Sequence, residues 1–91
     1  MKRKKSLNEF LEIPKEVYSN IPHIILTGFE EMIVENNNGI LEYDNYFIKI
    51  DTDIGIINIH GLNLNLEKMT EDNLKINGKI ENIEIERAID D

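Results

Sequence analysis

Apolar and polar residues alternate over most of the chain from residue 22 onward, and a period of two is typical of strands that bury one face. The clearest run extends from Leu62 to Leu66. Turn residues separate the runs, among them Asp44-Asn45 and Asn38-Gly39, and Asn-Gly is a strong signal for a hairpin. We therefore predict a mainly β domain over residues 22–86, with seven or eight short antiparallel strands joined by tight turns.

The face that carries the apolar residues changes at two places. The change from odd to even positions falls at Gly61, and a second change falls between Ile80 and Ile83. A bulge or a sharp bend has this effect. A unit of the form apolar-x-Gly also recurs, ending at Gly61 and at Gly78. These features fit a bent meander or a sandwich, which the hairpin turns favour, and they leave stacked solenoid-like rungs as an alternative. We assign structural roles in bends and turns to five glycines: Gly28, Gly39, Gly55, Gly61 and Gly78.

The first part of the chain has the pattern of a helix instead. Ser6 and Glu9 have the spacing of a capping box, and apolar residues follow at helical spacing. Pro22 closes the segment, because the residue before a proline is pushed out of helical geometry. We predict a short helical segment over residues 6–21.

Charge divides the chain into a basic arm, residues 1–5, and an acidic body. The net charge is -8, yet four of the ten basic residues lie in the arm, so the rest carries six positive against eighteen negative charges. Phosphates would be repelled by such a body, and we expect no binding to nucleic acid. The arm either contacts an anionic membrane surface or is a soluble tail. Candidate residues for docking to a membrane or a partner are Lys2, Arg3, Lys4, Lys5, Leu7, Phe10 and Leu11.

Candidate catalytic and metal-binding groups are few. The chain has no cysteine, and its two histidines, His23 and His60, lack carboxylates at ligand spacing in the sequence. The acidic stretch that starts at Asp51 departs from a calcium loop at Gly55, where a ligand is required, and we predict an ordinary turn there. We therefore expect no enzyme activity, no cofactor and no metal site.

Three aromatic residues, Tyr43, Tyr46 and Phe47, flank the predicted turn at Asp44-Asn45. Exposed together, they would form a contact surface. Packing in the core is the alternative interpretation of the same residues. Residues 87–91 form a polar tail.

The β region resembles the YabP/YqfC family of sporulation proteins, and its length resembles the YqfC branch. The resemblance extends over roughly residues 12–86, and it depends on the order and spacing of several short motifs rather than on any one of them. The stretches that carry it are Pro22–Gly28, Met32–Asn36, Gly39–Tyr43, Ile48–Thr52, Gly55–Gly61 with Leu62, Leu64 and Met69, and Leu74–Ile80 with Ile83 and Ile85.

What the resemblance implies is a non-enzymatic protein of endospore-forming bacteria. Members are made in the mother cell and are associated with sporulation and spore coat assembly. A protein partner is implied, in particular a membrane protein of the same process, and the family carries no catalytic residues over to this chain. The implied location is the mother-cell cytoplasm, with peripheral binding at the forespore membrane if the arm docks there. Homo-oligomer formation is left open.

Two functional hypotheses follow. The first is an assembly protein that works through protein contacts, made by sheet edges or by the aromatic turn. The second is a small β module that binds a cell-wall saccharide, with Asn63 and Asn65 beside exposed aromatic residues. The absence of tryptophan weighs against the second hypothesis.

Overall fold

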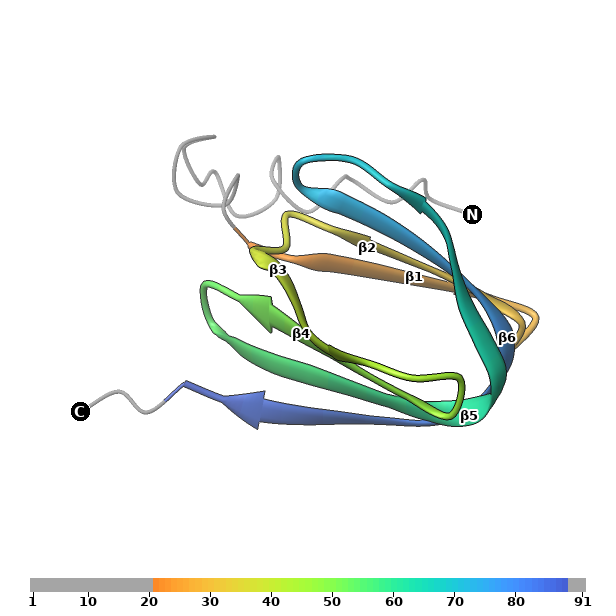
Figure 1. Cartoon of the computed structure of the whole chain (residues 1–91). Helices are drawn as coiled ribbons and strands as arrows, with labels where there is room; N and C mark the ends of the chain where they lie inside the picture. The colour runs from red at the N-terminus through yellow and green to blue at the C-terminus, as the bar shows by residue number, and fades with distance from the viewer. Residues whose placement is uncertain (1–20, 89–91) are drawn as a thin grey trace, which may run out of the picture.

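The computed structural model describes residues 21–88, and these residues form one antiparallel sheet of six strands (Figure 1). The order across the sheet is β1-β2-β6-β5-β4-β3, so that β1 and β3 are its two edges. The strands are β1 (His23–Thr27), β2 (Glu31–Glu35), β3 (Gly39–Tyr43), β4 (Phe47–Thr52), β5 (Gly55–Met69) and β6 (Asn73–Arg87). The predicted basic arm, the predicted tail beyond residue 88 and all of the predicted helical segment except Ile21 lie outside the described residues.

The sheet folds back on itself into two layers, because the two 15-residue strands β5 and β6 bend and run through both (Figure 1). The first layer, here the β2 layer, contains β1, β2 and residues 73–77 of β6, which pair with β2. The second, the β4 layer, contains β3, β4 and residues 55–60 of β5, which pair with β4. A hairpin therefore lies at the outside of each layer.

The bend is formed by two glycines on the paired long strands. A Cβ atom at Gly61 would collide with the carbonyl oxygen of Lys79, and one at Gly78 with that of Asn63. Gly78 also has a φ of +136°, which side-chain-bearing residues rarely adopt. The register shifts at His60/Gly61, and β6 carries one extra residue, Glu81, opposite this point. The change of face predicted between Ile80 and Ile83 is therefore confirmed as a bulge. The change predicted at Gly61 lies slightly further along β5: a second register shift falls between Leu62 and Asn65, and Leu62 is exposed whereas Leu64 is buried. The recurring apolar-x-Gly unit marks the bend on each strand.

The core lies between the layers and is purely aliphatic apart from one methionine. Side chains from the inner faces of β2, β4, β5 and β6 fill it, in the alternation expected of half-buried strands. Its members are Met32, Val34, Ile48, Ile50, Ile57, Ile59, Leu64, Leu74, Ile76 and Ile80.

The prediction of seven or eight strands is wrong, as is the solenoid alternative. Two pairs of predicted strands are continuous through the bend, because a bulge changes the face of a strand without ending it. Solenoid rungs would require parallel pairing, whereas every pairing here is antiparallel. The mainly β class and the meander are confirmed: β3, β4, β5 and β6 are consecutive neighbours.

The hairpin predicted at Asn38-Gly39 is also wrong. β2 and β3 lie in different layers, and the segment between them crosses from one to the other. The buried Asn37 holds this crossing: its Nδ2 donates to the carbonyl oxygen of Asp72 at 2.8 Å, and its Oδ1 accepts from the Gly39 amide at 2.9 Å. Tertiary hydrogen bonds of this side chain replace the local turn that the dipeptide favours.

Candidate functional site

The edge strand β1 is exposed along its whole length. Ile24, Ile25 and Leu26 retain 39%, 46% and 38% of their accessible surface. Ile24 and Leu26 are paired with Val34 and Met32, which are fully buried, so they lie on the inner face of the sheet. They stay exposed because the opposite layer does not extend over them.

Two hollows follow from this incomplete cover: one lies between the start of β1, the β4–β5 turn and the end of β6, and the other lies between the end of β1 and the second half of β6. The first has a volume of about 210 Å³ and is lined by Pro22, Ile24, Ile57 and Ile85, among others. The second, also about 210 Å³, is lined by residues that include Leu26, Phe29 and Ile83. We call β1, the turn that follows it and these two hollows the open seam.

Phe29 stands out within the open seam. It lies in the tight turn between β1 and β2, where Gly28 and Phe29 both have a φ of 59° and the Glu30 amide donates to the Thr27 carbonyl at 3.1 Å. This is the pattern of a type I′ turn, which Asn and Gly favour and which costs a bulky residue about 1 kcal/mol or more. The side chain gains little burial in return, because it is 71% exposed. A strained, exposed aromatic residue at an apolar hollow is a candidate contact residue.

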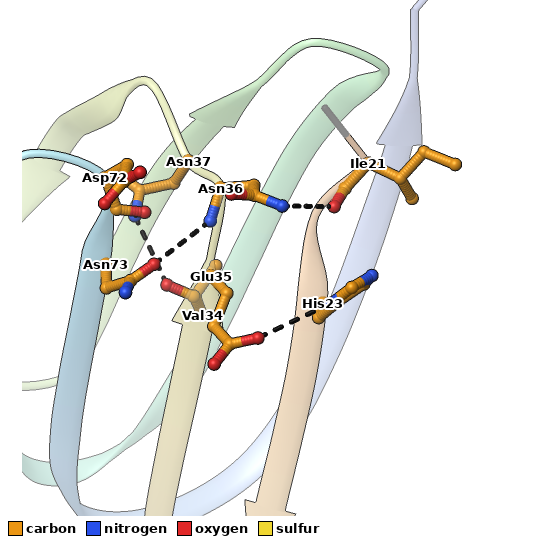
Figure 2. A network of polar contacts seen from close by, with 8 residues as sticks. All are labelled: Ile21, His23, Val34, Glu35, Asn36, Asn37, Asp72 and Asn73. Carbon is orange, nitrogen blue, oxygen red and sulfur yellow. Dashed lines mark hydrogen bonds and ion pairs between the residues drawn. The ribbon is translucent and has the colours of Figure 1, made fainter. Parts of the chain in front are cut away.

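A polar network fixes the other end of β1 (Figure 2). The side chain of Asn36 donates to the Ile21 carbonyl at 3.0 Å, and its backbone amide donates to Asn73 Oδ1 at 3.3 Å. His23 Nδ1 lies 3.4 Å from a carboxylate oxygen of Glu35 on the paired strand. The entry to β1 is thereby tied to β2 and to the start of β6, so the edge is held in place although it is exposed.

The seam at the other side of the molecule is closed by hydrogen bonds. Beyond the end of its pairing with β4, β5 directs three backbone amides at the β3–β4 hairpin. The Gly61 amide donates to the Tyr46 carbonyl at 3.2 Å, the Leu64 amide to the Asn45 carbonyl at 2.7 Å, and the Leu66 amide to the Tyr43 hydroxyl at 3.1 Å. We call this side the closed seam.

The predicted aromatic turn lies at the closed seam, and its three side chains have different surroundings. Tyr43 and Tyr46 are exposed, and Tyr43 bridges the seam through its hydroxyl. Phe47 is half-buried and lies against His60, with ring centroids 4.9 Å apart. A contact role for this turn remains a prediction.

The structure describes only some of the other site residues predicted from the sequence. The docking residues of the N-terminal arm and helix, from Lys2 to Leu11, lie outside the described residues. Gly28 lies in the β1–β2 turn, while Gly39 and Gly55 begin β3 and β5. Asn63 and Asn65, named for the saccharide hypothesis, are exposed on β5 near the bend.

In the described part of the chain, the contacts between titratable side chains lie at the surface. His60 Nε2 lies 3.5 Å from a carboxylate oxygen of Glu84, an exposed contact across paired strands. Over residues 21–88, no three histidine or acidic side chains are close enough together to hold a metal ion. The same residues contain no helix of the length and apolarity needed to cross a membrane.

Phe29 and the hollows were not found from the sequence. The available signal was Gly28 between two apolar runs, which indicates a turn but does not reveal that the next residue shares its left-handed conformation. The exposure of β1 depends on which strands become edges, and this follows from the long-range pairing of β2 with β6.

Comparison with known proteins supplies the family. No curated protein and no solved structure matches the chain. The YabP family matches residues 19–89, a span that includes every strand of the sheet. The chain therefore belongs to the YabP family.

Proposed function

We propose that the protein is a non-enzymatic assembly factor of sporulation, which acts in spore coat or forespore-surface assembly by contacts made at the open seam. Membership of the YabP family suggests an association with sporulation. The finer assignments belong to the proposal: membership of the YqfC branch, action in the mother cell, and a sporulation membrane protein as partner.

The observation that carries the proposal is Phe29. Its backbone conformation opposes the stability of the fold, and its side chain, 71% exposed, contributes little to the core. A residue that costs stability in the isolated protein is explained if it contributes binding energy elsewhere. Large aromatic side chains beside aliphatic hollows are typical anchors of protein contacts.

Charge agrees with a protein partner. The body of the chain is acidic, whereas the open seam is lined mainly by aliphatic residues and Phe29. Repulsion between acidic surfaces would confine a stable contact with another acidic protein to such an uncharged area. The basic arm, in the same proposal, adds contact with the anionic surface of the forespore membrane.

Localisation in sporulating cells tests the proposal. A C-terminal fluorescent fusion of the full chain is expected to form a ring or focus at the forespore. Phe29→Asn should abolish this signal, because it removes the anchor while favouring the type I′ turn. The matched control is Tyr46→Asn, which removes an exposed aromatic residue from the turn of the other hairpin and should leave the signal unchanged.

The outcomes separate the two candidate surfaces. Loss of signal with Tyr46→Asn alone would move the contact to the aromatic turn and contradict the open seam. A fusion that stays diffuse in the unmutated form, although it supports sporulation, would contradict an assembly role at the forespore. Deletion of residues 2–5 in the same fusion tests the contribution of the arm by itself.

A further inference from the structure

Strand edges expose unpaired backbone amides and carbonyls, and proteins usually protect them with charges, bulges or covering contacts. Besides the edge strands β1 and β3, the second halves of β5 and β6 are paired on one side only, so that within residues 21–88 the sheet has four stretches of edge. Three of the four carry such protection. β3 has a register shift between Ile40 and Glu42. The second half of β6 carries several charged residues between Glu81 and Arg87, and the second half of β5 is bonded to the β3–β4 hairpin.

The fourth stretch, β1, has none of these protections. Its sequence, His23–Thr27, contains no acidic residue, lysine, arginine, proline or glycine, and its pairing with β2 is regular over all five residues. All five side chains are exposed. Over the described residues, no strand pairs with its outer edge.

The order of residues in β1 makes the strand complementary to itself. If a second β1 runs antiparallel to it about a two-fold axis at Ile25, that residue faces its own copy and Ile24 faces Leu26. His23 then faces Thr27, so no charged pair is forced together. On the outer face, Ile33 of β2 is the neighbour of Ile25, so the pairing would form one isoleucine stripe across both copies.

We propose that two copies of this chain pair through β1, antiparallel and centred on Ile25, to give one sheet continuous over both. The proposal names a partner for the open seam and rests on the proposed function only in placing a contact there. A second copy fits better than an unrelated strand because the complementarity is present in one five-residue segment. On the inner face, the partner's Leu26 would lie beside Ile24 and extend the apolar lining of the hollows.

Sedimentation of the full chain over a range of concentrations is the first test, and a monomer–dimer equilibrium is expected. Ile25→Lys should weaken association about tenfold or more, because it places two like charges opposite each other at the axis. The matched control is Leu41→Lys, since Leu41 is the exposed central residue of the other five-residue edge strand. The control should leave association within about twofold of the original.

Cross-linking tests the register and does not depend on a charged variant. The chain has no cysteine of its own. Facing residues of an antiparallel pair have Cα atoms roughly 4.5–5.5 Å apart, within the range of a disulfide, so Ile25→Cys should oxidise to a covalent dimer. His23→Cys alone should not, because its two copies would be about 13 Å apart. An equimolar mixture of His23→Cys and Thr27→Cys should form the mixed dimer.

Several results would overturn the pairing. A full chain that is monomeric at every soluble concentration would do so, as would equal effects of Ile25→Lys and Leu41→Lys, or cross-linking of His23→Cys as fast as Ile25→Cys. A monomeric protein that still required Phe29 for localisation would contradict the pairing but not the proposed function. The partner of the β1 edge would then be a different strand or residues 1–20.

Discussion

The β1–β2 and β3–β4 hairpins have the same plan and different surfaces. Each has a three-residue connection and lies at the outside of one layer, and each turn accepts hydrogen bonds from the long strand that bends past it. The β3–β4 turn accepts the Gly61 and Leu64 amides, and the β1–β2 turn accepts those of Gly78 and Ile80. The architecture thus places two similar hairpins around one bent pair of strands.

Both turns are bonded to a long strand, but only the β3–β4 hairpin adds a side-chain bond that extends the closure along its edge strand. On β3, the hydroxyl of Tyr43 reaches β5, and a bulge and Glu42 interrupt the edge. On β1, apolar residues take these places, and Phe29 holds a conformation that a smaller residue would adopt more cheaply. The β3–β4 hairpin shows that this sheet can close a seam with a tyrosine, a bulge and a charged residue. The open seam therefore results from the residues of β1 and its turn, and the sheet topology does not require it.

The shared bend should be the most sensitive feature of the molecule. Gly61→Ala and Gly78→Ala each force a Cβ atom against a backbone carbonyl, and each should cost about 3 kcal/mol or more in the free energy of unfolding. Gly28→Ala is the control, because Gly28 also has a positive φ but has open space around it, and it should cost about 1 kcal/mol. Urea unfolding followed by circular dichroism measures all three. Similar losses for all would show that backbone conformation, and not the close approach, requires glycine at the bend.

Substitutions in the segment that crosses between the two hairpins should have the second-largest effect on the free energy of unfolding. Asn37→Ala removes a buried side chain that bonds to Val34, Asp72 and Gly39, and it should cost about 2–3 kcal/mol. Asn38→Ala removes an exposed contact with Asp53 and should cost about 0.5 kcal/mol. Thermal unfolding of both variants gives the difference, and equal melting temperatures would contradict the role of Asn37.

Removal of the Tyr43 hydroxyl from the closed seam should have a smaller effect. Tyr43→Phe removes the acceptor of the Leu66 amide, with a cost of about 0.5–1 kcal/mol and faster hydrogen exchange at that amide. Tyr46→Phe should change neither quantity, since only the backbone of Tyr46 takes part in the seam. Unchanged exchange at Leu66 in the Tyr43 variant would mean that the hydroxyl does not protect this amide.

The smallest effect has the opposite sign. Phe29→Asn should stabilise the isolated protein by about 0.5–1 kcal/mol, because Asn adopts a positive φ more readily and little burial is lost. Urea unfolding of the purified variant, compared with Phe29→Leu, measures it. The leucine variant keeps an apolar side chain and should gain nothing. A destabilised Asn variant would mean that the phenyl ring contributes to the fold, and it would remove the argument for a binding role.

Local signals in the sequence predicted what depends on neighbours along the chain. Alternation located the strands, and the change of parity between Ile80 and Ile83 located the bulge on β6, whereas the bulge on β5 lies just beyond the predicted Gly61. The count of strands was wrong because a strand that changes face just beyond Gly61 has the same sequence pattern as two strands. Asn38-Gly39 suggested a hairpin because a dipeptide carries no information about Asp72, the residue that binds Asn37 across the sheet. Neither open nor closed seam was predictable, because each depends on which strands end at an edge.

The pairing of β2 with β6 has a consequence for synthesis on the ribosome. The β1–β2 and β3–β4 hairpins each pair strands that are adjacent in the sequence. In contrast, β2 also pairs with β6, which begins only at Asn73. Met32 and Val34, which are fully buried in the finished fold, therefore lack the strand that pairs with theirs while β3, β4 and β5 are being made. Since non-local pairing is the slow part of β-sheet folding, the apolar β1–β2 hairpin lacks its neighbouring strand from the end of β2 at Glu35 until β6 begins at Asn73, and the sheet is completed only then.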